Sequence, residues 1–457
     1  ILLLLAGPWR RISRRTLLVA LLLLLLGPCL YLYVPLRSGR AVLNYWGGTE
    51  TLPGLVEYLT GRVYRYRFLA GGTGYLRTQL GEIPGLIARQ FTVFWLLVAP
   101  GVVLLWKRNR RVVVGLALAA LLSAALSFAY NIPDKEGYLL PTWLISAVFV
   151  GLGLALLRRT RASLPSTLTA CLAIVAVAAI SYPRQDRSRL HGLADLSRAL
   201  IAELPDHAVL FTNDYSIFQG VRWILDTEAH DHDMTVVSEH HLAFPWYLDR
   251  LKHTLPVPQR ALELSRRLWE EAVRTSDVAF GEKAKTTSEA IRYELTHTVL
   301  PSRPVFWIPR EFGDWPREWR GFALILNGLS YRVSASPGSS PVPALTFLGP
   351  DHYSTDRFRD AETQDLCRRF AAAANRRGML RFEREDPTGA LADFDLALAY
   401  YPDYTAPIEN KGLVYYFTNQ PDSAEKYLTL FVLKDPRSPD SPKANSVLQQ
   451  LRNRPDS

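Results

Sequence analysis

The sequence is poor in cysteine and in the motifs of common soluble enzymes. Only 3 of 457 residues are cysteines, and their spacing matches neither a disulfide framework nor a zinc site. There is no glycine-rich phosphate loop, no GxSxG elbow and no HExxH pair. These absences exclude the most familiar nucleotide-binding and hydrolytic motifs, so the function has to be sought in other features of the chain.

Acidic residues are also in deficit. There are 53 lysines and arginines against 43 aspartates and glutamates, which gives a net charge of +10. Much of this excess flanks apolar runs, where membrane orientation and anionic lipid headgroups explain it. We therefore predict no nucleic-acid partner.

Long apolar runs alternate with arginine clusters through the first 180 residues. Basic clusters occur at residues 10–15, 107–111 and 158–161. A bilayer core about 30 Å thick needs roughly 20 apolar residues of helix, and short basic loops stay in the cytoplasm. The pattern predicts a mainly α, multi-pass membrane protein with residues 35–88 and all residues after 182 outside the cytoplasm. The predicted spans are residues 16–34, 89–106, 112–130, 139–157 and 163–182.

The apolar residues 1–6 precede the first basic cluster. We interpret them as the end of an earlier span, in which case the chain continues a longer protein. A cleaved signal peptide is the alternative, but it fits less well because its basic residues should come before the apolar stretch.

The predicted outward loop, residues 35–88, is unusually basic. Residues 51–58 and 60–68 have the composition of short amphipathic helices that lie along a membrane surface. The turn at residues 131–138 is predicted to face the same compartment. A polar, arginine-bearing platform of this kind suits a lipid substrate that carries phosphate. The loop arginines are Arg37, Arg40, Arg62, Arg65, Arg67 and Arg77.

After residue 182 the composition is that of a soluble protein. Apolar spacing predicts helices over residues 190–204 and 217–225, and buried strands over 208–212 and 234–238. This order indicates a small α/β domain with parallel strands over residues 183–350. Further short strands are expected between residues 305 and 333.

The last hundred residues, 358–457, contain a repeat. Gly378 recurs as Gly412, Ala390 as Ala424 and Pro402 as Pro436, each after 34 residues. This is the period of the tetratricopeptide (TPR) helical hairpin, in which small residues let two helices approach closely. Residues 361–377 and 443–452 are predicted to form flanking helices.

Two clusters near the membrane are candidates for substrate binding. Arg37 follows a predicted span, where its guanidinium could make a bidentate contact with a lipid phosphate. Asp134, Lys135 and Tyr138 lie in the second outward turn, where a carboxylate could orient an acceptor hydroxyl. On position alone, a snorkelling arginine and a solvated turn are the better interpretations.

His230 and His232 alternate with Asp231 and Asp233, and His240 and His241 lie nearby, so this segment could bind a metal. They lie at a turn before a strand and lack helical or CxxC-type spacing. A solvated loop is the favoured interpretation, so we predict no metal site and no metal cofactor.

Several segments together resemble one family of multi-pass membrane proteins. That family includes transmembrane O-mannosyltransferases, and the tetratricopeptide repeats are a common addition in it. The most specific similarity lies in the first two outward segments, and the soluble segments 208–214, 245–247 and 328–332 are similar as well. The outward segments are Tyr31-Leu-Tyr-Val-Pro-Leu-Arg37, Leu43-Asn44-Tyr-Trp46-Gly, and Tyr130-Asn-Ile-Pro-Asp134-Lys135-Glu-Gly-Tyr138.

The resemblance implies a GT-C type glycosyltransferase. Such an enzyme transfers a sugar, here a mannose-like one, from a polyprenyl-phosphate donor to a protein hydroxyl on the outer face. The family's acidic Gly-Asp-Ser-Gly-Glu signature is not in this chain and would precede Ile1, so no catalytic residue is assigned. The residues implied in binding the donor phosphate or substrate are Arg37, Asn44, Trp46, Asp134, Lys135 and Tyr138.

A non-enzymatic alternative is a membrane-anchored TPR scaffold that binds a partner protein or peptide outside the membrane. The expected partners are therefore membrane lipid, the lipid-linked sugar and an acceptor protein.

The predicted outward segments contain no Asn-x-Ser/Thr sequon, which favours a bacterial inner membrane with periplasmic C-terminal domains.

Overall fold

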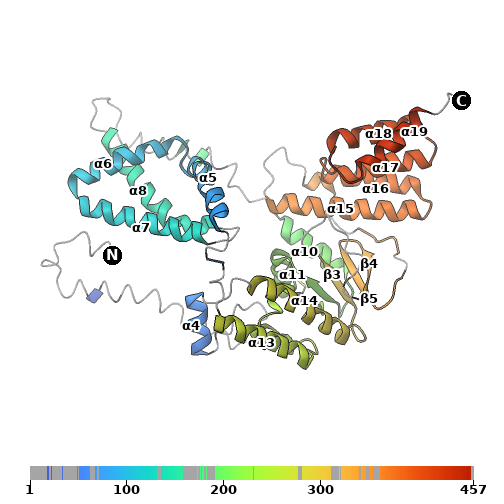
Figure 1. Cartoon of the computed structure of the whole chain (residues 1–457), viewed down its shortest axis with the longest axis horizontal. Coiled ribbons are helices and arrows are strands. Elements are labelled where there is room, and N and C mark those ends of the chain that lie inside the picture. The colour runs from blue at the N-terminus through green and yellow to red at the C-terminus, as the bar shows by residue number, and fades with distance from the viewer. Residues whose placement is uncertain are drawn as a thin grey trace. The chain divides into compact units, whose positions relative to one another are not determined.

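The structure is a computed structural model, shown in Figure 1. It forms two compact units, Ile1–Tyr182 with Arg267–Ala284, and Pro183–Arg266 with Lys285–Ser457, and each unit is described by itself. The predicted spans 16–34 and 163–182 lie outside the described residues apart from isolated positions. The described residues are 51–61, 67–68, 72–130, 135–157, 191–229, 231–275, 280–309, 319, 321–338, 341–345, 349–353 and 361–453, with isolated positions between 18 and 49 and between 172 and 182.

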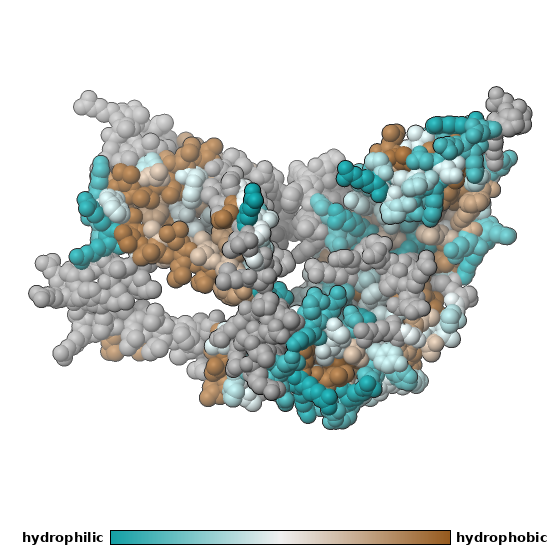
Figure 2. Space-filling view, in the orientation of Figure 1, coloured by the Kyte–Doolittle hydropathy of each residue, from teal (hydrophilic) through white to brown (hydrophobic). Residues whose placement is uncertain are grey.

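Two helices of the first unit, α7 and α8, are long and apolar enough to cross a membrane. They are α7 (Arg110–Ala129) and α8 (Leu140–Leu157). Their apolar stretches, Arg110–Ala129 and Gly137–Ala155, have mean hydropathies of 2.4 and 1.8 and are mostly unburied within the protein. At 1.5 Å per residue, 20 residues span about 30 Å, the thickness of a bilayer core. Figure 2 shows apolar side chains over much of the visible surface of α6, α7 and α8.

The predicted span at residues 89–106 is not one continuous helix. It comprises the end of α5 (Gly72–Phe91), the 3-10 helix η3 (Thr92–Leu97) and the start of α6 (Val98–Arg108). Pro100 lacks a backbone N–H, and its ring crowds the carbonyl of Leu96 four residues earlier. The usual hydrogen bond to the Leu96 carbonyl is therefore missing, α6 begins just before the proline at Val98, and the preceding residues take the 3-10 form.

Two glycines allow α6 and α8 to touch through their backbones. A Cβ atom added at Gly101 would overlap the carbonyl oxygen of Phe149, and one added at Gly153 would overlap that of Leu97. The contact is reciprocal, since each glycine lies against the carbonyl one helical turn before the other glycine. Small residues at helix crossings of this kind are typical of packing inside membranes.

Helix α4 (Leu52–Thr60) is capped at both ends. The Thr51 side chain accepts a hydrogen bond from the N–H of Gly54 at 3.2 Å, and Gly61 ends the helix with φ 56°. The helix predicted over residues 51–58 is confirmed with a small shift. The second one, over residues 60–68, lies mostly outside the described residues.

The second unit contains a mixed five-stranded sheet with the order β2-β1-β3-β5-β4. β1 (Val209–Thr212) pairs in parallel with β2 (Thr235–Ser238) and β3 (Val305–Ile308), and all residues of these strands are buried. β4 (Ala323–Asn327) and β5 (Ser330–Ser334) extend the sheet as an antiparallel hairpin. The two predicted strands at 208–212 and 234–238 are confirmed, but the sheet is mixed rather than purely parallel.

The helices of this unit follow the expected order. The predicted helices at 190–204 and 217–225 are α10 (Gly192–Glu203) and α11 (Tyr215–Thr227). After β2 come α12 (Pro245–Leu251), α13 (Gln259–Thr275) and α14 (Phe280–Val299). The end of α13 and the start of α14 fall within Arg267–Ala284 and so belong to the first unit. Asp214 begins α11, because its side chain accepts hydrogen bonds from the N–H groups of Ser216 and Ile217.

The repeat in the sequence corresponds to two helical hairpins. The first is α15 (Ala361–Glu383) with α16 (Pro387–Tyr400), and the second is α17 (Thr405–Phe417) with α18 (Pro421–Lys434). A Cβ at Gly378 would lie 2.6 Å from Phe394, and one at Gly412 would lie 2.7 Å from Leu428, so both glycines have the same packing role. The segment 361–377 is not a flanking helix, since it is the first part of α15, whereas 443–452 lies in the terminal helix α19 (Ser441–Arg452).

Candidate functional site

Aromatic side chains gather at the end of α7 that lies away from the basic cluster 107–111. The Tyr130 ring lies 5.3 Å from that of Phe68 and 5.8 Å from that of Tyr138. Phe68 and Tyr130 also form an antiparallel backbone bridge, and the Tyr75 hydroxyl donates a hydrogen bond to the Tyr130 carbonyl at 3.2 Å. Phe68 of the basic loop and Tyr130, which precedes the second outward turn, therefore meet at one end of the helices although they are far apart in sequence.

Side-chain hydroxyls hold the start of α8 against α7. Ser123 donates a hydrogen bond to the carbonyl of Tyr138 at 3.0 Å, and Thr142 donates one to the carbonyl of Ala120 at 2.9 Å. Such interhelical bonds stabilise helix pairs in an apolar environment. They fix where the 3-10 turn η4 (Lys135–Leu139) lies relative to the end of α7.

Of the sequence-predicted site residues, Tyr138 is the one whose side chain is described, and it is 54% exposed. Lys135 begins η4, and only its backbone is described. Arg37, Asn44, Trp46 and Asp134 lie outside the described residues. Their predicted roles in binding therefore stay predictions.

A second concentration of polar groups lies at the carboxyl edge of the sheet, where β1, β2 and β3 end. In sheets with parallel strands on either side of a reversal in strand order, the crevice at this edge is the usual ligand site. Here Arg369 from α15, whose side chain is 1% exposed, lies between the segments that follow β1 and β3. Its guanidinium donates to a carboxylate oxygen of Asp214 at 2.8 Å, to the carbonyl of Pro309 at 2.9 Å and to Asp365 at 2.7 Å.

Each nitrogen of this guanidinium donates to a protein oxygen, and the other Asp214 oxygen caps α11. The protein's own side chain therefore occupies the place where a ligand would be expected. The arrangement attaches the first repeat helix to the sheet, which is a structural role.

A buried ion pair lies beside this crevice. Glu239, which follows β2, accepts hydrogen bonds from Arg292 at 2.5 Å and from the Trp307 indole at 2.7 Å. The Arg292 guanidinium also lies 4.7 Å from the centre of the Trp319 ring. Both carboxylate oxygens thus have donors, so this cluster stabilises the packing of α14 on the sheet.

His241 lies in an aromatic environment at the same edge. Its ring is 5.3 Å from that of Tyr247 and 5.8 Å from those of Phe218 and Trp246. Burial, with a smaller contribution from the nearby His240, lowers the pKa of His241 to about 4. The imidazole is therefore neutral at physiological pH, in keeping with a place in the core.

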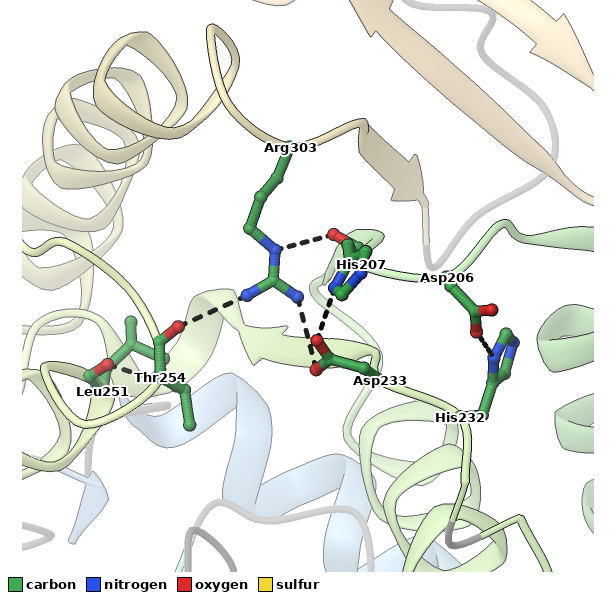
Figure 3. Close-up of polar contacts among 7 residues, drawn as sticks. All are labelled: Asp206, His207, His232, Asp233, Leu251, Thr254 and Arg303. Carbon is green, nitrogen blue, oxygen red and sulfur yellow. Dashed lines mark hydrogen bonds and ion pairs between the residues drawn. The ribbon is translucent and has the colours of Figure 1, made fainter.

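Two further histidines, His207 and His232, lie at the amino edge of the sheet (Figure 3). His207 pairs with Asp233 at 2.5 Å, and His232 pairs with Asp206. Arg303 connects this edge to its surroundings by donating to the His207 carbonyl at 2.6 Å and to the Thr254 carbonyl at 3.3 Å.

These pairs tie together the loops that precede β1, β2 and β3, and no metal-binding group of side chains occurs within the described part of the chain. The histidine-rich segment therefore contacts these neighbouring loops, while the side chains of His207, Asp233 and Asp206 remain exposed. It contributes to a set of structural contacts, although His230 itself lies outside the described residues.

Sequence reasoning missed the groups at the carboxyl edge. Asp214 was not predicted to begin a helix, although an aspartate directly before an amphipathic segment is a recognised helix-start signal. The pairing of Arg369 with Asp214 and of Arg292 with Glu239 gave no local signal, because these partners are 155 and 53 residues apart in the sequence. Two of the soluble segments that carry the family resemblance, 208–214 and 245–247, do come together at this edge.

Comparisons with protein-family models, with curated proteins and with solved structures found no match to this chain.

Proposed function

We propose that this protein is a multi-pass membrane glycosyltransferase of the GT-C type. It would transfer a mannose-like sugar from a polyprenyl-phosphate donor to a protein hydroxyl outside the cytoplasm. The observation that carries the proposal is the contact between Phe68 and Tyr130. It links the arginine-rich loop to the turn that contains Asp134, as a shared donor site requires.

The chemistry demands positive charge where the phosphate leaves. Negative charge builds up on the lipid phosphate as the sugar is transferred, and guanidinium groups stabilise it best through bidentate contacts. The loop contains several arginines, and Arg37 is the one that we propose to contact the phosphate. Tyr138, with its exposed ring beside Tyr130, suits contact with the sugar or the isoprenoid chain.

This assignment includes a location. The proposed setting is a bacterial inner membrane with α7 and α8 as two of several spans, and with the sheet and the repeated hairpins in the periplasm. Two long apolar helices support the membrane placement. The hairpins of 34-residue period would form a tetratricopeptide-like array that presents the acceptor protein.

The test is transfer of labelled mannose from polyprenyl-phosphomannose by membranes in which the protein is expressed. We expect Arg37→Ala to reduce transfer at least tenfold. Arg437→Ala removes an exposed arginine from the repeat region and serves as the matched control. Unchanged transfer in the Arg37 variant would rule out its proposed role, and no transfer by the unaltered protein would count against the enzyme itself.

A non-enzymatic scaffold remains the second candidate, and one observation favours it. Phe417 is 67% exposed and Met379 is 44% exposed, and both lie on the first helices of their hairpins. Exposed apolar residues on a helical-repeat surface are typical of peptide binding. This candidate predicts that Phe417→Ala weakens co-purification of a partner while Arg37→Ala changes nothing.

A further inference from the structure

Helix α4 has an apolar face that the rest of the described protein does not cover. Leu52, Val56 and Leu59 are 74%, 50% and 48% exposed, and their spacing of four and three residues puts them on one side of the helix. Leu55, at the edge of this face, is buried, so the protein covers the neighbouring side of α4. Glu57 lies on the opposite side of the helix.

The chain keeps this face close to the ends of the two long apolar helices. Gly61 and Phe68 are seven residues apart, which corresponds to at most about 25 Å of extended chain. Phe68 is fixed by its backbone bridge to Tyr130, at the end of α7. Tyrosines at the ends of apolar helices are typical of the membrane–water boundary. Helix α4 is therefore held within reach of that boundary.

The sequence after α4 provides complementary charge. Arg62 and Arg65 follow within five residues of the helix end, and phospholipid phosphates are the negative groups present at a membrane surface. A short helix with one apolar face and adjacent basic residues is the usual form of a segment that lies in the membrane interface.

We propose that α4 lies in the interface of an anionic phospholipid bilayer, with Leu52, Val56 and Leu59 directed into the boundary between headgroups and acyl chains. The proposal rests on the membrane placement of α7 and α8 in the proposed function, but it does not depend on any transferase activity.

The experiment measures the depth of single cysteine labels. In the full chain, Cys29, Cys171 and Cys367 are replaced by serine, and one cysteine is introduced by Leu52→Cys, Val56→Cys or Leu59→Cys. Glu57→Cys, on the opposite side of the same helix, is the matched control. Each variant is labelled with a fluorescent nitrobenzoxadiazole group and reconstituted into nanodiscs of phosphatidylethanolamine and phosphatidylglycerol that contain nitroxide-labelled lipid.

We expect the nitroxide lipid to quench labels at positions 52, 56 and 59 at least twofold more than the label at position 57. Equal quenching at all four positions, or none, would overturn the proposal. Energy transfer between two labelled copies in one nanodisc, without lipid quenching, would identify a second copy as the occupant and would also overturn it.

Measurement of sugar transfer by the same reconstituted variants separates the two proposals. Strong lipid quenching without transfer supports the anchoring of α4 and counts against the glycosyltransferase. Sugar transfer without lipid quenching supports the glycosyltransferase and counts against the anchoring of α4.

Discussion

The ion pair between Arg369 and Asp214 should control how the repeated hairpins attach to the sheet. Arg369→Ala removes a buried guanidinium and leaves the Pro309 carbonyl without this donor. Breaking a buried pair by removing one partner typically costs about 3–5 kcal/mol, because the other charge stays buried without compensation. At 1.4 kcal/mol per factor of ten, the opening of this interface should rise by roughly two to four orders of magnitude.

Hydrogen–deuterium exchange of the purified protein measures this opening directly. We expect faster exchange in α15 and at the start of α11, because Asp214 pairs with Arg369 of α15 and also caps α11. The neighbouring variant Arg368→Ala is the control. The Arg368 side chain is exposed and lies 5.2 Å from the Tyr401 ring, a contact worth about 0.5–1 kcal/mol.

A second substitution isolates the charge. Asn caps helices about as well as Asp, so Asp214→Asn keeps the start of α11 but removes the negative charge. In the Arg369→Ala background it should restore part of the lost protection, because no unpaired carboxylate then remains buried. If Arg369→Ala and Arg368→Ala changed exchange equally, the reasoning that Arg369 holds the repeats to the sheet would be wrong.

Two further predictions concern packing and pH. Gly153→Ala should destabilise the first unit by about 1–3 kcal/mol, because the new methyl group overlaps a backbone carbonyl. The control is Gly151→Ala, which should be neutral or slightly stabilising because no atom lies within 4 Å of the new methyl group. Thermal unfolding in detergent compares the stabilities of the two variants. Burial raises the pKa of Glu203 from 4.5 to about 7, against the effect of hydrogen bonds from residues 327–330. The protonated carboxyl therefore favours the folded state, so this contribution of about 3 kcal/mol is complete below pH 4.5 and is lost as the pH rises through 7. Urea unfolding at pH 5 and pH 8 should show this decrease, and Glu203→Gln should remove it; an unchanged slope in the variant would contradict the assignment.

The sequence was a good guide to elements that are defined by local patterns. Apolar runs predicted α7 and α8, and continuous buried runs predicted β1 and β2. The 34-residue period predicted that Gly378 and Gly412 share one packing role, because close helix approach needs a small residue at a fixed place in each hairpin.

Features that depend on distant partners could not be predicted in this way. The break before α6 required deciding whether Pro100 ends a helix or is tolerated within it, and that depends on neighbouring helices. The antiparallel β4–β5 hairpin joins a sheet whose first strands gave a parallel pattern. Arg369 lies 155 residues from Asp214, so no local spacing in the sequence predicts their ion pair.

In the candidate site too, some features follow from local sequence patterns and others do not. Basic loops predicted that residues 35–88 and 131–138 face one compartment, and the contact of Phe68 with Tyr130 is consistent with that expectation. The individual roles of Arg37 and Asp134 rest on resemblance, because both lie outside the described residues.

The reciprocal glycine contact between α6 and α8 also constrains chain length. One inserted residue turns the rest of an α-helix by about 100° and shifts it by about 1.5 Å. An insertion in α8 before Gly153 would rotate that glycine out of the crossing and bring a side chain against the Leu97 carbonyl. The number of residues between η4 and Gly153 is therefore as restricted as the glycine itself, and changes in length should be tolerated only in the turns.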